Sequence, residues 1–333
     1  MIDNIIIEME IDDFLLRFNN VAKNKSKIMV AYSGGKDSDI ILSLLKHHNL
    51  LNKVQLVMFD TGIEFEANKK HISKLISEGI DIKIIRAKKP VPLCTKQYGE
   101  PFVSKYVSEM LERLQKHNFS FNEDGLKNYS ELSKLYPKCL SAIRWWSNYY
   151  GSKYDPNKKN QKDYGGSSKS SFNISRNKLL KEYLLKHGLD FKVSNKCCKF
   201  AKKDTSKVFE KEFKPELLIT GIRKSEGGIR ARTYNQCFID RGNNMSLWLP
   251  IIWWKDDFLE SYKSYKKLRF NEAYEIYNLK RTGCAGCPLG RNLSKERAVL
   301  KKYEPNLSRG VENIFKNTYR NTEAYNKFKL GGC

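Results

Sequence analysis

Residues 28–45 read IMVAYSGGKDSDIILSLL and combine three elements in a fixed order. The apolar run at the start of this stretch is typical of a buried strand, and Asp39–Leu45 at its end has helical spacing. Between these two elements, Gly34 and Gly35 permit a tight turn and a close approach of the backbone to a ligand. Such a junction binds phosphate, because free N–H groups and the positive helix end point at the anion. The sequence therefore predicts an anion-binding loop at the end of a strand.

The loop Ser33–Ser38 reads SGGKDS. It is not a Walker loop, which has four residues between its first glycine and its Gly-Lys pair. It resembles the PP-loop of the ATP pyrophosphatase superfamily, whose pattern is Ser-Gly-Gly-x-Asp-Ser. The resemblance implies that the chain binds ATP, cleaves it between the α and β phosphates and adenylates a substrate. The alternative is an ordinary glycine-rich turn between a strand and a helix.

The PP-loop resemblance implies a role for each residue of the loop. The backbone of Ser33–Lys36 would hold the pyrophosphate, and the Lys36 ammonium would neutralise the charge that develops on it. The Ser38 hydroxyl would bond a phosphate. Two roles are open to Asp37, which either caps the helix or helps to hold the Mg²⁺ that such reactions usually need.

Strands and helices alternate around this loop. Residues 54–60 and 82–86 are further strand-like runs, and residues 66–78 between them are expected to form a helix. This alternation predicts an α/β fold with a doubly wound, mostly parallel, Rossmann-like sheet. In such sheets ligands bind at the carboxyl ends of the strands. Because Asp60 and Thr61 come at the end of the second strand, we expect them near the adenosine or the ribose.

The strand pattern is interrupted after residue 90 and resumes with a strand expected at 216–221 and a further strand or extended segment at 248–252. The intervening stretch and the end of the chain read mainly as helices. The predicted regions are a nucleotide-binding α/β domain (1–90 and 190–255), a helical insertion (91–189) with a flexible loop near 155–171, and a helical C-terminal region (256–333) that carries the second of two cysteine pairs.

The insertion contains an aromatic and basic stretch, Arg144–Tyr150, which reads RWWSNYY. Aromatic rings next to positive charge stack on the bases of single-stranded nucleic acid. A helix that buries its aromatic side chains in a core would give the same pattern, and both interpretations remain open.

Four of the eight cysteines form two pairs. Cys197 and Cys198 are adjacent, and Cys284 and Cys287 form a Cys-x-x-Cys about 85 residues later. Four thiolates can hold a [4Fe–4S] cluster or a structural zinc. Adjacent cysteines cannot form the Cys-x-x-Cys knuckle that a zinc ribbon usually presents, so the pattern favours the cluster. Zinc and unliganded or redox-active thiols are the alternatives. The lysines at 199, 202 and 203 either place positive charge near this site or form a solvated helix face.

The two cysteine pairs and their spacing are similar to the cluster pattern of the iron–sulfur APS/PAPS reductases. Three further segments of the chain resemble that family, at residues 59–65, 220–232 and 249–257. In residues 220–232 the resemblance implies that Arg223, Arg230 and Arg232 contact a nucleotide and its anionic groups. The resemblance covers roughly residues 25–90 and 190–300, and it does not cover the insertion.

The chain departs from those reductases in two respects. Sulfonucleotide reductases generally have a degenerate PP-loop, whereas here the full Ser33–Ser38 pattern is present. Their nucleophilic cysteine lies in a Glu-Cys-Gly-(Leu/Ile)-His segment, which is absent here. Cys333 at the end of a Gly-Gly tail is either a mobile nucleophile or incidental.

The complete loop and the cysteines resemble the adenylating enzymes of DNA phosphorothioation and several tRNA thiolases. This resemblance implies an ATP pyrophosphatase that adenylates a substrate, expected to be a nucleic acid, for sulfur transfer, with ATP, Mg²⁺ and a [4Fe–4S] cluster as cofactors. The first alternative is a PAPS or APS reductase that releases sulfite. The second is a non-catalytic nucleotide-binding module.

The composition favours a polyanionic partner. The formal net charge is +24, with 61 Lys and Arg against 37 Asp and Glu. A basic surface of this kind binds phosphate backbones, although a solvated basic face is the alternative. A sulfur donor or a thiol reductant protein is the other expected partner, and the oligomeric state is open.

The sequence also carries expectations about location. It has no run of 18 apolar residues, so no membrane helix and no membrane partner are expected. No basic segment precedes an apolar stretch near Met1, which argues against a secretory signal and for a cytoplasmic protein.

Overall fold

The computed structural model describes residues 2–149, 174–227, 232–242 and 244–331. The chain forms two compact units. The first unit comprises Met1–Pro90, Phe200–Ala285 and Glu296–Leu307, and the second comprises Val91–Lys199, Gly286–Lys295 and Ser308–Cys333. The loop predicted near 155–171 lies outside the described residues.

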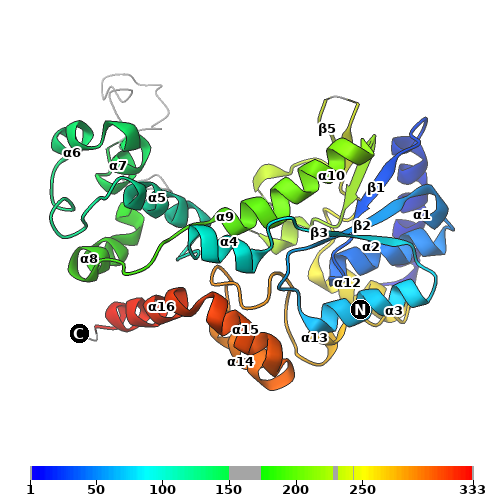
Figure 1. Ribbon diagram of the computed structural model, residues 1–333. Helices are drawn as coiled ribbons and strands as arrows, with labels where there is room; N and C mark the ends of the chain where they lie inside the picture. The colour runs from blue at the N-terminus through cyan, green and yellow to red at the C-terminus, as the bar shows by residue number, and fades with distance from the viewer. Residues whose placement is uncertain (1, 150–173, 228–231, 243, 332–333) are drawn as a thin grey trace. The chain divides into compact units, whose positions relative to one another are not determined.

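The first unit contains a six-stranded sheet of order β3-β2-β1-β4-β6-β5 (Figure 1). Neighbouring strands are parallel, apart from β5 and β6, which are antiparallel. The predicted doubly wound, mostly parallel sheet is confirmed. The strands are β1 (Ile28–Ala31), β2 (Gln55–Asp60), β3 (Ile82–Arg86), β4 (Leu217–Thr220), β5 (Phe238–Asp240) and β6 (Ser246–Trp248).

Residues 248–252, predicted as a strand or an extended segment, overlap β6 only at Trp248, because β6 begins and ends earlier. The chain turns after Leu249, where the Ile252 N–H donates to the Leu249 carbonyl. Pro250 has no N–H for a ladder hydrogen bond, which explains why the strand does not continue.

Helices cover both faces of this sheet. Val30 and Leu56 point to one face, where they pack with α1, α2, α3 and α12. Met29 and Val57, one residue out of phase, point to the other face, where they pack with Phe209 of α10. The helices that contribute residues to the first unit are α1 (Asn4–Val21), α2 (Lys36–His47), α3 (Glu66–Ser77), α10 (Thr205–Phe213), α12 (Asp256–Tyr265), α13 (Glu272–Glu275), α14 (Leu293–Tyr303) and α15 (Pro305–Ile314).

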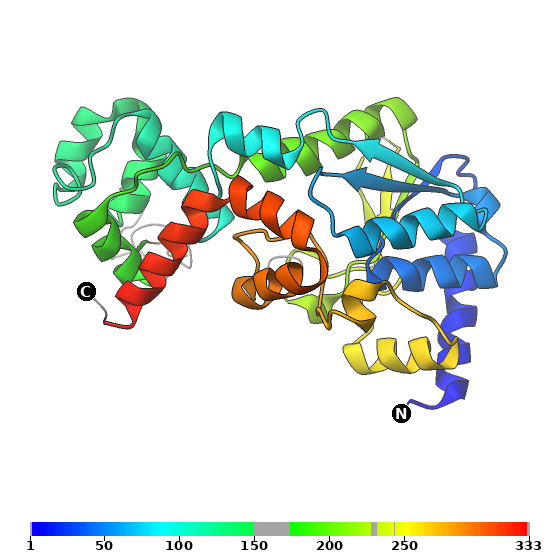
Figure 2. The same cartoon turned by 60° about the horizontal axis from the view of Figure 1, so that its bottom comes forward.

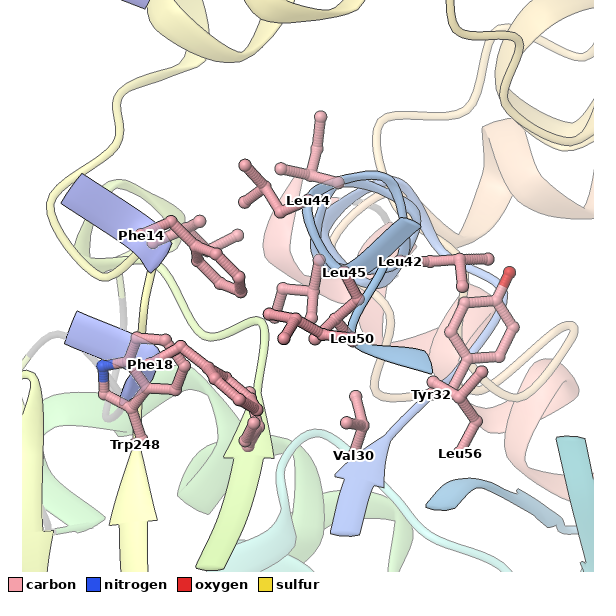
Figure 3. Close-up of a cluster of buried hydrophobic side chains, with 14 of the residues drawn as sticks. Phe14, Phe18, Val30, Tyr32, Leu42, Leu44, Leu45, Leu50, Leu56 and Trp248 are labelled. Atoms are coloured by element: carbon pink, nitrogen blue, oxygen red, sulfur yellow. The ribbon is translucent and has the colours of Figure 1, made fainter. Parts of the chain in front are cut away.

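Aromatic and aliphatic side chains fill the space between the sheet and the helices on its first face, the face to which Val30 and Leu56 point (Figure 3). Phe14 and Phe18 of α1 lie against Trp248 of β6, with ring centroids 5.1 and 6.0 Å apart. Leu44 and Leu45 on the inner side of α2 are fully buried. This packing fixes α2 on the sheet, and with it the loop that precedes α2.

The second unit is helical, and Figures 1 and 2 show no strand among its described residues. Its core includes Trp145 and Trp146, which are 1% and 0% exposed. Of the two interpretations of Arg144–Tyr150, the buried one therefore holds for the two tryptophans. The helices that lie wholly in this unit are α4 (Val91–Tyr98), α5 (Lys105–Lys116), α6 (Tyr129–Leu135), α7 (Leu140–Trp146), α8 (Lys178–His187), α9 (Lys196–Cys198) and α16 (Lys316–Lys329), and α14 and α15 contribute residues to both units. None of the described helices in either unit is long and apolar enough to cross a membrane.

The strand order places the loops after β1 and β4 next to each other. β1 pairs with β2 on one side and with β4 on the other, and a sheet of this kind opens a crevice at the carboxyl ends of the strands where the order reverses. The backbones approach closely there, because a Cβ added at Gly221 would lie 2.9 Å from the Asp37 carbonyl oxygen. The fold therefore brings the segment after β4 onto the first turn of α2.

Hydrogen bonds to the Glu216 side chain link the start of β4 to the segment just before β1. The Glu216 Oε2 accepts hydrogen bonds from the N–H groups of Ser26 (2.6 Å) and Lys27 (2.9 Å). These backbone hydrogen bonds, first those from Lys27 and then those from Ser26, lower the pKa of the Glu216 carboxyl. A lowered pKa in the folded protein stabilises the fold above the carboxyl's ordinary pKa, and this contribution is lost as the pH falls through the lowered value.

We expect Glu216→Gln to lower the thermal unfolding midpoint near neutral pH by roughly 2–4 °C. The difference in unfolding midpoint between wild type and variant should begin to narrow as the pH falls below about 4. It should vanish only below the lowered pKa of Glu216, where this side chain is neutral in the folded protein as well. Thermal unfolding followed by circular dichroism over this range measures it. Exposed Glu212 in α10 gives the control, Glu212→Gln. A difference in unfolding midpoint that does not change with pH would contradict this role of the Glu216 carboxylate.

Candidate functional site

The loop between β1 and α2 is closed by its own side chains. The Ser38 hydroxyl donates to the Gly35 carbonyl (2.7 Å) and accepts from the Ser33 N–H (3.3 Å). Gly34 has a φ of +68°, and a Cβ at this position would lie 2.3 Å from the Asn68 Oδ1. Position 34 therefore requires glycine both for its backbone conformation and for its contact with Asn68.

Two buried amides hold the carbonyl groups of this loop. Asn68 of α3 donates from Nδ2 to the Ser33 carbonyl (2.9 Å), and Asn271, the N-cap of α13, donates from Nδ2 to the Gly34 carbonyl (2.5 Å). The two side chains are 2% and 3% exposed. The loop is therefore fixed by the protein itself, which is the preorganisation that anion stabilisation requires.

Tyr274 and Thr282 complete the surroundings of Gly35. Their hydroxyl oxygens are 3.0 Å apart, and a Cβ at Gly35 would meet them at 3.1 and 3.4 Å. Burial raises the pKa of Tyr274, although hydrogen bonds from Thr282 and from the Lys36 backbone oppose the shift. The Tyr274 hydroxyl thus stays protonated next to the loop.

An ion network around the buried Arg223 side chain joins the loop to the segment after β4. Arg223 is only 2% exposed. Its Nε donates to the Asp37 Oδ1 (2.6 Å), and its Nη1 donates to the Asp256 Oδ1 (2.8 Å) and the Ser225 Oγ (2.8 Å). The Lys36 Nζ lies 3.8 Å from the same Asp256 oxygen. The structure thus brings together Lys36, Asp37 and Arg223, three of the residues predicted from the sequence.

The charges of this network influence one another. Burial raises the pKa of Asp37, against the opposing effect of the Arg223 guanidinium. The hydrogen bond from Arg223 lowers the pKa of Asp256. The N-cap of α2 is Gly35 and no described side chain caps this helix, so the alternative in which Asp37 is the cap is wrong. The Asp37 carboxylate lies in the first helical turn with Arg223 as its partner. Its predicted part in holding Mg²⁺ stays a prediction.

We expect Arg223→Met to destabilise the first unit by about 3–5 kcal/mol, because it leaves the Asp37 carboxylate buried without its partner. Urea unfolding measures this loss, and exposed Arg241 gives the control variant, Arg241→Met. Adding Asp37→Asn to Arg223→Met should recover part of the loss, since it removes the uncompensated charge. Strictly additive losses in the double variant would show that the two side chains are not coupled.

The side chains at the end of β2 form hydrogen bonds with other residues of the turn that follows this strand. The Asp60 Oδ1 accepts from the Gly62 N–H (2.8 Å), and the Thr61 hydroxyl donates to the Oε1 of buried Glu64 (2.6 Å). β2 is the neighbour of β1, so this turn lies at the same edge of the sheet as the loop. The predicted contacts of Asp60 and Thr61 with adenosine or ribose stay predictions.

Two of the remaining predicted residues, Arg230 and Cys333, lie outside the described residues. Arg232 is exposed. The roles suggested for these three side chains therefore stay predictions as well.

Cys284 belongs to the first unit and lies beside the β2 turn. Its Sγ is 3.5 Å from the Thr61 Oγ1. Burial raises the pKa of the Cys284 thiol, and Lys202, which lies in the π-helical stretch Lys199–Asp204, opposes the shift. Among the three lysines considered from the sequence, Lys202 thus places positive charge at a cysteine. Positive charge next to a thiol favours the thiolate form, in which cysteine ligates metals.

The other three cysteines of the predicted metal site, Cys197, Cys198 and Cys287, belong to the second unit. Among the described residues, no group of three or more His, Cys, Asp or Glu side chains is arranged to hold a metal ion. The four-cysteine site therefore stays a prediction.

Sequence reasoning missed four of the residues that shape the loop: Asn68, Asn271, Tyr274 and Thr282. Asn271 carries a local signal, since an Asn before a short helix is a typical N-cap, but that signal says nothing of its second contact. No local pattern marks the other three, because their roles arise from contacts between distant parts of the chain.

Comparison with known families and proteins identifies one family model and one relative. Residues 159–289 match the family model of the phosphoadenosine phosphosulfate reductase domain. A relative of uncharacterized function from Methanocaldococcus jannaschii is 34% identical over 132 residues, which are 37% of this chain. The match spans 27% of the length of that relative.

Two solved structures are also similar. The phosphoadenylyl-sulfate (PAPS) reductase of Candida auris, in a phosphate complex, has 12% identity and a TM-score of 0.41 over 84% of this chain and 90% of its own. The U34-tRNA thiolase NcsA of Methanococcus maripaludis, solved with its [4Fe-4S] cluster, has 14% identity and a TM-score of 0.37 over 97% of this chain and 78% of its own.

Proposed function

We propose that the chain, whose residues 159–289 match the phosphoadenosine phosphosulfate reductase domain, splits ATP and adenylates an acceptor. The observation that carries the proposal is the complete Ser33–Ser38 loop, closed on itself and held by Asn68 and Asn271. A sulfonucleotide has no pyrophosphate leaving group, so a reductase has little use for such a loop.

In the proposed reaction an oxygen of the acceptor attacks the α-phosphorus of ATP. The bond between this phosphorus and the α–β bridging oxygen breaks, the adenylate forms and pyrophosphate leaves with its electron pair. The backbone of the loop and Lys36 stabilise the charge that develops on the leaving group. A sulfur nucleophile then displaces AMP from the acceptor.

Arg223 has a positioning role in this account. It holds the Asp37 carboxylate at the start of α2 and fixes Asp256, which in turn lies near the Lys36 ammonium. Mg²⁺ would take Asp37 as its protein ligand and would neutralise charge on the phosphates. These contacts support an anion site in which the Lys36 ammonium lies near Asp256, a carboxylate held by the buried Arg223.

The acceptor that we propose is a nucleic acid, because the net charge of +24 suits a phosphate backbone. A [4Fe–4S] cluster on Cys197, Cys198, Cys284 and Cys287 would supply iron with affinity for sulfur ligands. The donor set is four thiols, one of which, Cys284, lies next to the Lys202 ammonium.

The test is a pyrophosphate-release screen with ATP and a set of acceptors, including short DNA and RNA strands. We expect release that depends on the acceptor. The family match favours a second candidate, a reductase, for which sulfite would be released from PAPS or APS. If sulfite is released from PAPS or APS and no pyrophosphate is released from ATP, the protein is a reductase and the proposed adenylation is wrong.

The proposed cluster makes a separate prediction. Protein purified without oxygen should be brown and contain iron and sulfide, and Cys284→Ser should lose most of the iron because three thiolates remain. Cys237→Ser, which changes a cysteine outside the two pairs, is the control and should keep it. Colourless protein with stoichiometric zinc would contradict the cluster.

A further inference from the structure

The second unit has a cavity of about 600 Å³ between the starts of α6 and α8 and the end of α7. Its lining is polar, aromatic and basic. The residues that carry the argument are Lys127, Tyr129, Ser147, Tyr149 and Lys181. None of these was assigned a part in the chemistry of ATP.

Two tyrosines form a flat wall of this cavity. The rings of Tyr129 and Tyr149 have centroids 3.8 Å apart and planes 17° apart, so they stack face to face. Tyr149 is 41% exposed, in contrast to the buried Trp145 and Trp146 that precede it. An exposed ring whose other face is already held by a partner is a rigid surface for stacking a base.

Positive charge borders the stacked rings. The Lys181 ammonium donates to the Trp146 carbonyl (3.1 Å) and lies 5.1 Å from the centroid of that ring, which fixes its position at the cavity. Lys127 pairs with Asp124 (2.5 Å), and exposed Arg144 donates to the Tyr129 hydroxyl (3.4 Å). The second unit carries more than half of the net positive charge on less than half of the residues.

One polar atom at the cavity is left without a partner. Ser147 is a lining residue, and its Oγ is buried and makes no hydrogen bond among the described residues. A buried hydroxyl without a partner costs free energy, and a ligand with a donor or acceptor at this point would remove the cost.

We propose that this cavity binds a nucleotide of a single-stranded nucleic acid. The base stacks on Tyr149, the backbone phosphate lies near Lys127 and Lys181, and the Ser147 hydroxyl bonds to the base or the sugar. A single strand is the fitting partner because a base inside a duplex is already stacked on both faces. The inference rests on the proposed function in one respect, since it identifies the site as the place where the acceptor strand is held.

The test is fluorescence anisotropy with the full chain and a short labelled DNA or RNA strand. Tyr149→Ala should weaken binding about tenfold, the loss expected for one stacked base, whereas Tyr149→Phe, which keeps the ring, should bind like the wild type. The duplex of the same sequence should bind more weakly than the single strand. Circular dichroism confirms that each variant is folded.

Three results would overturn the inference: wild-type affinity in Tyr149→Ala, equal affinity for the duplex, or competition by AMP as strong as by the strand. The last would show that the occupant is a free nucleotide. Strand binding and pyrophosphate release are separate readouts. If strand binding depends on Tyr149 but ATP releases no pyrophosphate, only the proposed function is wrong. If ATP releases pyrophosphate but strand binding does not depend on Tyr149, only this inference is wrong.

Discussion

Pyrophosphate release from ATP should fall roughly 10²–10³-fold in Lys36→Met, the loss typical of removing one group that stabilises charge in the transition state. The variant removes the ammonium, and methionine keeps an apolar chain of nearly the same length as the lysine stem. The nearest ion partner of the ammonium is Asp256, at 3.8 Å. The assay couples released pyrophosphate to a colour reaction and compares variant and wild type at saturating ATP.

Lys46→Met provides a control on the same helix. Lys46 is exposed in the last turn of α2, so its replacement removes an equal charge far along the helix from the loop. Its pyrophosphate release should match the wild type. If Lys36→Met keeps its activity, the positive charge of the loop has no part in the reaction, and the assignment of the loop is wrong.

Gly34→Ala should both destabilise the first unit and abolish nucleotide binding. At a φ of +68° an alanine is strained by about 1 kcal/mol. Its Cβ would also lie 2.3 Å from the Asn68 Oδ1 and force that amide away from the Ser33 carbonyl. Overpacking of this kind adds about 1–3 kcal/mol, so the total loss should be about 2–4 kcal/mol. Urea unfolding and ATP titration calorimetry measure the two effects.

The variant Gly79→Ala distinguishes the cost of a positive φ from the cost of the steric contact with Asn68. Gly79 also has a positive φ, +89°, but a Cβ at this position would meet nothing within 4 Å. We expect Gly79→Ala to lose only about 1 kcal/mol of stability and to bind ATP normally. Equal losses at the two positions, or full ATP binding by Gly34→Ala, would show that the contact with Asn68 does not shape the loop.

The sheet and the loop could be predicted from the sequence because both are encoded locally. An apolar run, two glycines and a helix follow one another within residues 28–45, and the structure has β1, the loop and α2 in that order. The alternation of strands and helices then specified a parallel sheet. The ends of strands are harder to predict. The apolar pattern continues past the end of β6, but Pro250 lacks the N–H that a continued strand needs.

The partners of the loop could not be predicted, because they come from distant parts of the chain. Asn68 and Asn271 are 203 residues apart and reach the same loop. Arg223 was expected to bind anions directly, and in the described site its guanidinium holds two carboxylates, Asp37 and Asp256. Its burial, at 2% exposure, comes from the approach of the β4 loop to α2, which no local pattern expresses.

The aromatic stretch shows a third kind of limit. Aromatic residues at helical spacing fit either a core or a binding surface, and only burial separates the two. Trp145 and Trp146 pack inward, while Tyr149, after the helix ends at Trp146, is exposed and stacks on Tyr129. A single stretch of sequence thus serves both the core of the second unit and its cavity wall.

The most direct test of the account follows the phosphates of ATP. ATP labelled at the γ-phosphate, mixed with the full chain, Mg²⁺ and a nucleic acid acceptor, should yield its label as pyrophosphate, with AMP formed in step. This outcome would show α–β cleavage, the reaction proposed for the loop Ser33–Ser38. Label recovered as inorganic phosphate with ADP, or ATP left intact while the same protein releases sulfite from PAPS, would contradict the account.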